Sequence, residues 1–275
     1  AFDRDINTGL TQEKDMGFPP INTRREDEDD ACWQMRVDLA AVHRLAVQNG
    51  YNSGIFNHFT ARVPGTDDRY YQIPFGTHWA EVQASHFMEV GYDGTIHKGT
   101  GDAELSCICI HGPMHRLADH AAVVLHTHMP HASALTRLAD QHILPIGQTE
   151  LGTISQIAYD ESYGGFAYDP AEGERLTNVL GSRNVLMMAN HGVTVVGRTV
   201  AEAWDRLYYL ERSAQVQLYA MWTGKPLRIL PDEMVQATME AYKQPPKMYG
   251  GKKNSEHHFA ALKRLLDKSE PDYRD

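Results

Sequence analysis

The sequence lacks an apolar run long enough to cross a membrane, and it has few cysteines and few basic residues. A transmembrane helix needs about 20 mostly apolar residues, so we expect no membrane partner. The three cysteines are an odd count in 275 residues, and the chain opens without the pattern of a secretory signal. Both features favour reduced thiols and a cytoplasmic protein. Acidic side chains outnumber basic ones by 36 to 26, which argues against nucleic acid and anionic lipid as partners.

Two apolar segments that contain histidine dominate the middle of the sequence. The segment AAVVLHTHM ends at Pro130 and predicts a buried strand. Because side chains alternate along a strand, His126 and His128 should point to the same side. The segment NVLMMANHGVTVV reads as a second strand, interrupted by His191. Three imidazoles from two strands are able to bind a divalent metal and leave a position open for substrate. The alternative is that these histidines are buried and satisfied by backbone groups.

The segments HTHMPHASAL and LMMANHGVTVVG together resemble the class II aldolase/adducin family. The segments NHFTAR, IPFGTHWAEVQASHFMEVGYDG, IAYDESYGG and AEAWDRLYYLERSAQVQLYA agree with this resemblance, which covers roughly residues 30 to 230. The resemblance implies that His126, His128 and His191 hold the metal. We expect Zn²⁺, with Mn²⁺, Fe²⁺ or Co²⁺ as alternatives.

The expected elements divide the chain into three parts. Residues 1–29 are polar and predict an extended N-terminal arm, residues 30–230 the class II aldolase/adducin-like domain, and residues 231–275 a C-terminal tail with a short helix. The alternation of helices and strands favours an α/β fold. The resemblance implies three α/β/α layers around a mixed, largely antiparallel sheet.

Local signals place several elements within this domain. Apolar spacing predicts a helix over residues 32–48, and Asp93-Gly94 predicts a hairpin turn. Residues 106–119 read as a helix kinked at a proline, and residues 144–165 as a loop-rich stretch. Thr199 predicts the cap of a long helix.

The resemblance implies a lyase. In similar aldolases the metal stabilises the enolate-like intermediate left by carbon–carbon cleavage, and the same electron sink serves decarboxylation. We therefore expect a metal-dependent aldolase or decarboxylase acting on a small oxygen-rich acid or hydroxy-carbonyl compound. One alternative is a non-haem iron-dependent oxygenase using the same three histidines, and another is a non-catalytic adducin-like interaction module.

One departure from the family pattern bears on the reaction. Sugar-phosphate aldolases of the family carry a catalytic glutamate four residues before the histidine matching His111, and that position is Cys107 here. A thiol is a poor base unless its pKa is lowered. The first serine of the family's phosphate-binding pair is replaced by Leu105, while Ser106 remains. Glu104 is out of register with the missing base. The departures favour substrates other than sugar phosphates.

For the remaining candidate site residues, we weigh a functional role against a purely structural one. Tyr163, on a glycine-flanked loop, is the candidate general acid, and Glu150 is the candidate replacement base; loop packing and a solvated acid are the alternatives. Arg62 would pair a substrate carboxylate or a structural acid. His58 reads as polar packing. The expected substrate-binding residues are Asn57, Thr60, Arg62, Ser106, Cys107 and Gln148.

We also expect assembly into a homotetramer that takes a small-molecule substrate near a subunit boundary. The family resemblance implies tetramers, and the amphipathic stretch Glu256–Lys268 has no evident place in the core. The apolar stripe of such a helix needs a surface to cover it.

Overall fold

Eight strands form one mixed sheet in the computed structural model, which describes residues 19–243 and 251–275. Their spatial order is β4-β3-β2-β1-β5-β8-β7-β6, and β6 and β7 form the parallel pair in an otherwise antiparallel sheet. The predicted mixed, largely antiparallel sheet is confirmed. The strands are β1 (His58–Arg62), β2 (Arg69–Gln72), β3 (Met88–Gly91), β4 (Ile96–Lys98), β5 (Val123–Thr127), β6 (Ile157–Asp160), β7 (Val185–Met188) and β8 (Val193–Gly197).

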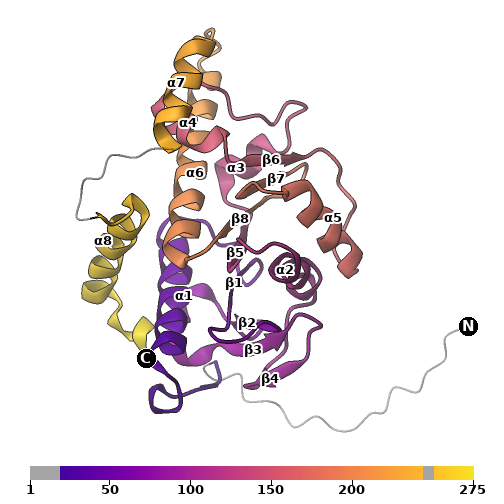
Figure 1. Cartoon of the computed structure of the whole chain (residues 1–275), viewed down its shortest axis with the longest axis vertical. Coiled ribbons are helices and arrows are strands. Elements are labelled where there is room, and N and C mark those ends of the chain that lie inside the picture. Colours follow the sequence, from indigo (N-terminus) through magenta and orange to yellow (C-terminus); the bar gives the residue numbers. More distant parts are fainter. Residues whose placement is uncertain (1–18, 244–250) are drawn as a thin grey trace, which may run out of the picture.

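Helices cover both faces of the sheet, which gives the three-layer α/β/α arrangement. Figure 1 shows α1, α6 and α8 on one side of the strands and α2 and α5 on the other. The helices are α1 (Asp30–Gln48), α2 (Leu105–Leu117), α3 (Pro130–Leu135), α4 (Gln148–Ile154), α5 (Pro170–Leu180), α6 (Val200–Trp222), α7 (Asp232–Lys243) and α8 (Asn254–Ser269).

Alternation along the strands places the buried residues on the two faces of the sheet, in one large and two smaller clusters. Phe59 and Leu125 belong to the larger core under α1 and α6. Their neighbour Val124 belongs to the core under α2 and α5. By the same alternation His58, Thr60 and His126 face the α2 side of the sheet, because side chains two residues apart share a face. The α2 side is therefore where the histidines gather.

Close approach of the backbone holds α2 in place on this side. A Cβ atom at Gly173 of α5 would lie 2.1 Å from the Cys109 carbonyl oxygen of α2, and one at Gly112 would lie 2.6 Å from the Tyr92 carbonyl oxygen. Only glycine permits such contacts, because any Cβ would overlap backbone atoms. Pro113 lies inside α2, as the sequence predicts.

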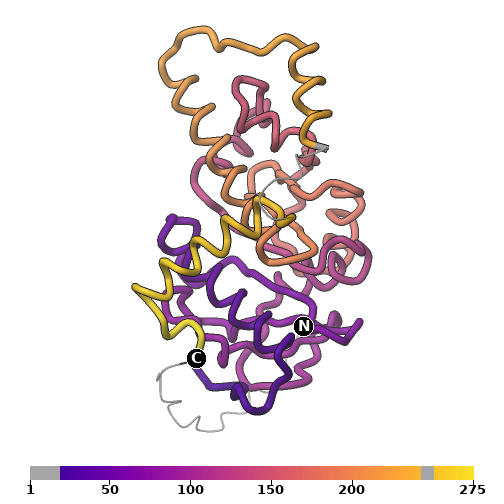
Figure 2. The backbone as a smooth tube through the Cα atoms, turned by 60° about the vertical axis from the view of Figure 1, so that its left-hand side comes forward, coloured from indigo at the N-terminus to yellow at the C-terminus, as the bar shows by residue number. Residues whose placement is uncertain are grey.

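Two segments differ from the prediction. The segment around His191 is a hairpin of β7 and β8 rather than one strand, and His191 lies in the connecting turn. The stretch expected to be a loop contains α4 and β6. Figure 2 shows α4 lying between α6 and α7. Propensity is weak in such short elements, so tertiary contacts decide their structure: α4 packs against α6 and α7, and β6 pairs with β7.

The C-terminal tail packs onto the chain's own core. Phe259 and Leu266 of α8 are buried against α1 and α6, and Tyr273 is fully buried beyond the helix. Most of the apolar stripe of α8 is thus covered within one subunit, although Leu265 stays 60% exposed. The sequence did not predict the helix α7. Of the predicted arm, residues 1–18 lie outside the described residues. Among those described, no helix has both the length and the hydropathy needed to span a membrane.

Candidate metal centre

The three predicted histidines meet in one cavity. His126 lies near the end of β5, His128 just beyond it, and His191 in the β7–β8 turn. The ring centroids lie 5.0 Å apart for His126 and His128, 5.0 Å for His126 and His191, and 4.9 Å for His128 and His191. Their candidate ligand atoms lie within 4.8 Å of one another, and all three residues line a cavity of about 450 Å³.

The backbone around the histidines is unusual in a way that serves this geometry. Asn57 and Asn190 adopt left-handed backbone angles (φ 75° and φ 58°), which few residues other than glycine tolerate. The Asn57 side-chain oxygen accepts a hydrogen bond of 3.3 Å from the backbone N–H of His128. A Cβ at Gly192 would lie 2.6 Å from Cδ2 of His128. Backbone strain of this kind is stored where a structure holds a site in shape.

The ring nitrogens are arranged as metal ligands require. Nδ1 of His126 donates to the Val193 carbonyl oxygen at 3.0 Å, so Nε2 keeps a free lone pair. Nε2 of His128 is shielded from solvent and has no hydrogen-bond partner among the described residues. Burial lowers the pKa of His126 well below 6.5 and that of His128 to about 4. Burial and the Arg137 charge lower the pKa of His191. Neutral imidazoles with unused nitrogens suit a divalent metal.

Glu104 and His58 also line this cavity, and sequence reasoning missed both. Glu104 caps the N-terminus of α2, where it accepts from the Cys107 N–H at 2.8 Å. Its Oε2 lies 3.4 Å from Nε2 of His58, and the Ser106 hydroxyl donates to its Oε1 at 2.6 Å. An acidic residue directly before a helix is a cap signal. In the sequence, Glu104 is not singled out because it does not occupy the position of the family's catalytic glutamate.

Behind His58 a chain of hydrogen bonds runs into the protein. His58 Nδ1 is 2.9 Å from His111 Nε2, and Thr60 Oγ1 is 2.7 Å from His111 Nδ1 and 2.8 Å from His115 Nε2. His115 Nδ1 must donate to the Ala121 carbonyl oxygen at 2.8 Å, because a carbonyl only accepts. Thr60 then donates to His115, His111 donates to Thr60, and His58 donates to His111. This order leaves a lone pair on His58 Nε2, facing the cavity.

A second group with metal-ligand potential consists of His58, Cys107 and His111. Nδ1 of His58 and both nitrogens of His111 already take part in the hydrogen-bond chain. Burial raises the pKa of the Cys107 thiol well above its ordinary 9.0, so the thiol stays protonated. Cys107 packs with Tyr70 and Met88 rather than lining the cavity. The chemistry of these residues fits internal hydrogen bonding better than metal binding.

The predicted substrate-binding residues separate into two sets. Asn57 and Ser106 line the cavity. Thr60 does not, because its hydroxyl joins two buried histidines. Arg62 donates to backbone carbonyls at the C-terminus of α2, including that of Ala118 at 3.0 Å, so its guanidinium serves the helix end rather than a substrate.

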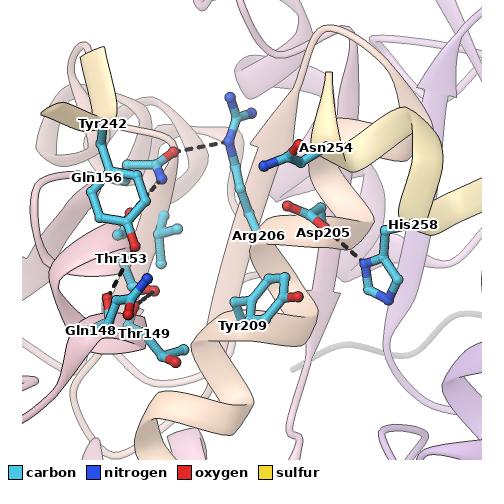
Figure 3. A pocket seen from close by; sticks show the side chains of 12 residues that line it. Gln148, Thr149, Thr153, Gln156, Asp205, Arg206, Tyr209, Tyr242, Asn254 and His258 are labelled. Carbon is cyan, nitrogen blue, oxygen red and sulfur yellow. Dashed lines mark hydrogen bonds and ion pairs between the residues drawn. The ribbon is translucent and has the colours of Figure 1, made fainter. Parts of the chain in front are cut away.

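Gln148 and Glu150 lie on α4, away from the three histidines. Gln148 lines a different pocket of about 670 Å³, where its backbone carbonyl oxygen accepts a hydrogen bond of 3.1 Å from the Tyr242 hydroxyl (Figure 3). Glu150 is only 3% exposed and is not a solvated acid. The structure brings neither residue to the histidine cavity within one chain, because α4 packs beside α6 and α7.

Tyr163 lies at the mouth of the histidine cavity. It belongs to the connection between β6 and α5, is 54% exposed, and its ring centroid is 6.4 Å from that of His191. The predicted acid candidate and the three histidines are therefore brought together. Arg137, which sequence reasoning did not single out, also lines this cavity.

Comparison with known proteins gives matches along most of the chain. The family described as Class II Aldolase and Adducin N-terminal domain matches residues 37–218. A putative aldolase class 2 protein of Caulobacter vibrioides is 33% identical over 80% of this chain and 85% of its own. An aldolase II superfamily structure from Pseudomonas syringae superposes with a TM-score of 0.84 at 33% identity, covering 91% of this chain and 99% of that one. The L-fuculose 1-phosphate aldolase of Glaciozyma antarctica PI12 shares the fold, with a TM-score of 0.75 at 20% identity over 94% and 97% of the two chains.

Proposed function

Because this chain belongs to the class II aldolase and adducin family, we propose that it is a metal-dependent lyase of aldolase or decarboxylase type. Its substrate would be a small oxygen-rich acid or hydroxy-carbonyl compound. The observation that carries the proposal is the meeting of three neutral imidazoles in one cavity, with ring nitrogens left unused. A buried nitrogen without a partner also occurs in the core, at His43 Nε2, so the convergence of three such rings on one cavity, rather than any single free nitrogen, indicates a ligand.

We propose His126, His128 and His191 as the metal ligands, with Zn²⁺ expected first and Mn²⁺, Fe²⁺ or Co²⁺ as alternatives. A divalent metal held by these residues supplies Lewis acidity toward a substrate oxygen. The hydrogen bond from His126 Nδ1 to Val193 fixes the ring so that Nε2 points away from the strand.

Glu104 is the proposed proton acceptor, in place of Glu150. Glu104 is the only carboxylate among the described residues that line the cavity. Its Oε2 faces the lone pair of His58 Nε2 across 3.4 Å. Two acceptor atoms face each other there, so a proton taken from a substrate hydroxyl would satisfy both. The hydrogen-bond chain behind His58 keeps that lone pair directed at Glu104.

Tyr163 is the proposed proton donor. It lines the same cavity as Glu104 and is exposed at the mouth, where its hydroxyl is available to a bound substrate. An acid and a base that line one cavity suit both retro-aldol cleavage and protonation of the carbanion left by decarboxylation.

The experiment that tests the proposal combines metal analysis with a variant of the base. We expect about one divalent metal per chain, and turnover without O₂ of substrates from a panel of hydroxy- and oxo-acids. Glu104→Gln should keep the metal and lose about 10²- to 10⁴-fold in turnover. Glu150→Gln is the matched control and should retain both. Strict dependence of turnover on O₂ with bound iron would favour the oxygenase instead. Absence of metal after gentle purification would favour an adducin-like module.

We also propose a cytoplasmic homotetramer. With α8 covered by its own chain, the remaining support is a group of exposed apolar side chains at the end of α6 and in α7: Val216, Tyr219, Trp222 and Met234. Exposed apolar groups of this size mark interaction surfaces. A monomeric mass by light scattering at micromolar concentration would contradict this assembly.

A further inference from the structure

Aromatic side chains surround the mouth of the histidine cavity. Phe56, Tyr163, Phe166 and Tyr168 line it and are 61%, 54%, 80% and 63% exposed. We call these four residues the aromatic rim. The rings of Phe166 and Tyr168 are stacked, with centroids 5.6 Å apart and an interplanar angle of 13°. Exposed aromatic groups around a concave site typically provide apolar contact for a ligand.

Arg137 adds one cation to the wall of this cavity. Its Nη1 is anchored by the carbonyl oxygens of Ser133 at 2.5 Å and His191 at 2.9 Å, and by the Thr136 hydroxyl at 3.2 Å. Neither Nε nor Nη2 of Arg137 has a hydrogen-bond partner within residues 19–243 and 251–275. In proteins, the Nε and Nη2 edge of a guanidinium commonly binds a carboxylate through two parallel hydrogen bonds, and this edge of Arg137 is free to do so.

Three hydrogen-bond donors in and beside the cavity are already used, and a carboxylate lines its wall. The Ser106 hydroxyl donates to Glu104, and the Thr60 and Arg62 donors are used internally. The Glu104 carboxylate lines the same cavity and would repel a doubly charged anion. Among the described residues that line the cavity, Arg137 offers the one free guanidinium edge, which favours a ligand with a single negative charge.

We propose that the substrate is an aryl-substituted carboxylic acid with a second oxygen beside the carboxylate, its carboxylate bound by Arg137 and its ring by the aromatic rim. This inference rests on the proposed function, since the second oxygen would be the atom presented to the metal. The cavity of about 450 Å³ accommodates a molecule of this size.

The test uses a reference ligand, two probes that each lack one of its features, and a sugar-phosphate-type competitor. Calorimetry on the metal-loaded full chain would compare 3-phenyllactate, lactate, 3-phenyllactamide and dihydroxyacetone phosphate. Lactate lacks the ring and 3-phenyllactamide lacks the charge. We expect 3-phenyllactate to bind at least about tenfold more tightly than either, and more tightly than dihydroxyacetone phosphate.

Variants then assign each feature to its residues. Arg137→Gln should weaken binding of 3-phenyllactate and lactate by about tenfold or more and leave 3-phenyllactamide nearly unchanged. Arg137→Lys keeps the charge but not the paired donors and should fall between. Phe166→Leu should weaken 3-phenyllactate without affecting lactate. Arg212→Gln, which replaces an exposed arginine outside the cavity, is the matched control for Arg137→Gln.

The outcomes separate this inference from the proposed function. Metal-loaded protein that binds dihydroxyacetone phosphate better than 3-phenyllactate would overturn the aryl acid and leave the metal lyase standing. Equal affinities for 3-phenyllactate and lactate would overturn the role of the rim. A change of mass in solution for Phe166→Leu, with unchanged affinity for 3-phenyllactate, would assign the rim to subunit contact instead. A wild-type chain that takes up no metal would refute the proposed function itself.

Discussion

Two clusters of histidines lie side by side on the α2 side of the sheet, and they differ in the hydrogen bonds that their ring nitrogens make. The front cluster is His126, His128 and His191. The back cluster is His58, His111 and His115. In the front cluster at least one shielded nitrogen has no partner, whereas both nitrogens of His111 and of His115 are engaged. Burial lowers the pKa in both clusters. The comparison teaches that free ring nitrogens converging on a cavity, rather than residue type, distinguish the candidate ligands from histidines that hydrogen-bond to one another.

Metal content gives the largest expected contrast between the clusters. His191→Ala should lose most of its divalent metal, because each front histidine supplies one of three protein ligands. His115→Gln should keep it, since His115 lies at the far end of the hydrogen-bond chain. Elemental analysis of both purified variants decides the matter. Equal metal loss from the two variants would contradict a metal-binding role confined to the front cluster.

The pH dependence of stability should report on the buried, non-ligand histidines. Burial lowers the pKa of His115 to about 3 and that of His43, outside both clusters, to about 4. An unfolded histidine has a pKa near 6.5, so the unfolded chain binds more protons below that pH. Stability should therefore fall as pH drops below 6.5, by about 1.4 kcal/mol per pH unit for each such histidine, until the folded pKa is reached.

Urea unfolding of chelator-treated protein between pH 7 and pH 5 would measure this slope. His43→Leu should flatten it by about one histidine's share. A steeper slope in that variant, or stability that rises on acidification, would show that these rings are charged in the folded chain.

Thr60→Val tests whether the hydrogen bonds of the back cluster stabilise the fold. The change removes the hydroxyl between His111 and His115 and leaves two buried nitrogens without a partner. The free energy of unfolding should fall by about 2 kcal/mol, with metal content retained. Thr223→Val, at an exposed helix end, is the control and should cost far less. Unchanged stability for Thr60→Val would mean that the chain of hydrogen bonds contributes little.

Cys107→Ser should have the smallest effect on the site. The thiol is protonated, fully buried and outside the cavity wall, so metal content and most activity should remain. A buried hydroxyl in place of the thiol should cost about 1 kcal/mol of stability. Loss of metal or turnover in this variant would assign Cys107 to the centre as a ligand or nucleophile. Cys109→Ser on the same helix is the matched control.

The elements with strong local signals could be predicted from the sequence. Asp93-Gly94 does form the turn between β3 and β4, and Thr199 does cap α6 with a hydrogen bond from the Glu202 N–H at 3.2 Å. Both signals act over a few residues, so no knowledge of distant neighbours is needed. The helix α4 has no comparable signal. Its existence, and with it the position of Glu150, depends on packing against α6 and α7.

For the site itself, the sequence alone determined which histidines are candidates, because a three-histidine pattern and its family resemblance can be read residue by residue. Only the tertiary structure decided which carboxylate accompanies them. Glu104 enters the cavity because α2 begins there and its first turn needs a cap, and His58 lies opposite because β1 pairs with β5. The tautomer of His58 depends in turn on Ala121, 63 residues further along the chain. Hydrogen bonds between distant segments exist only once the chain has folded, so no local pattern encodes them.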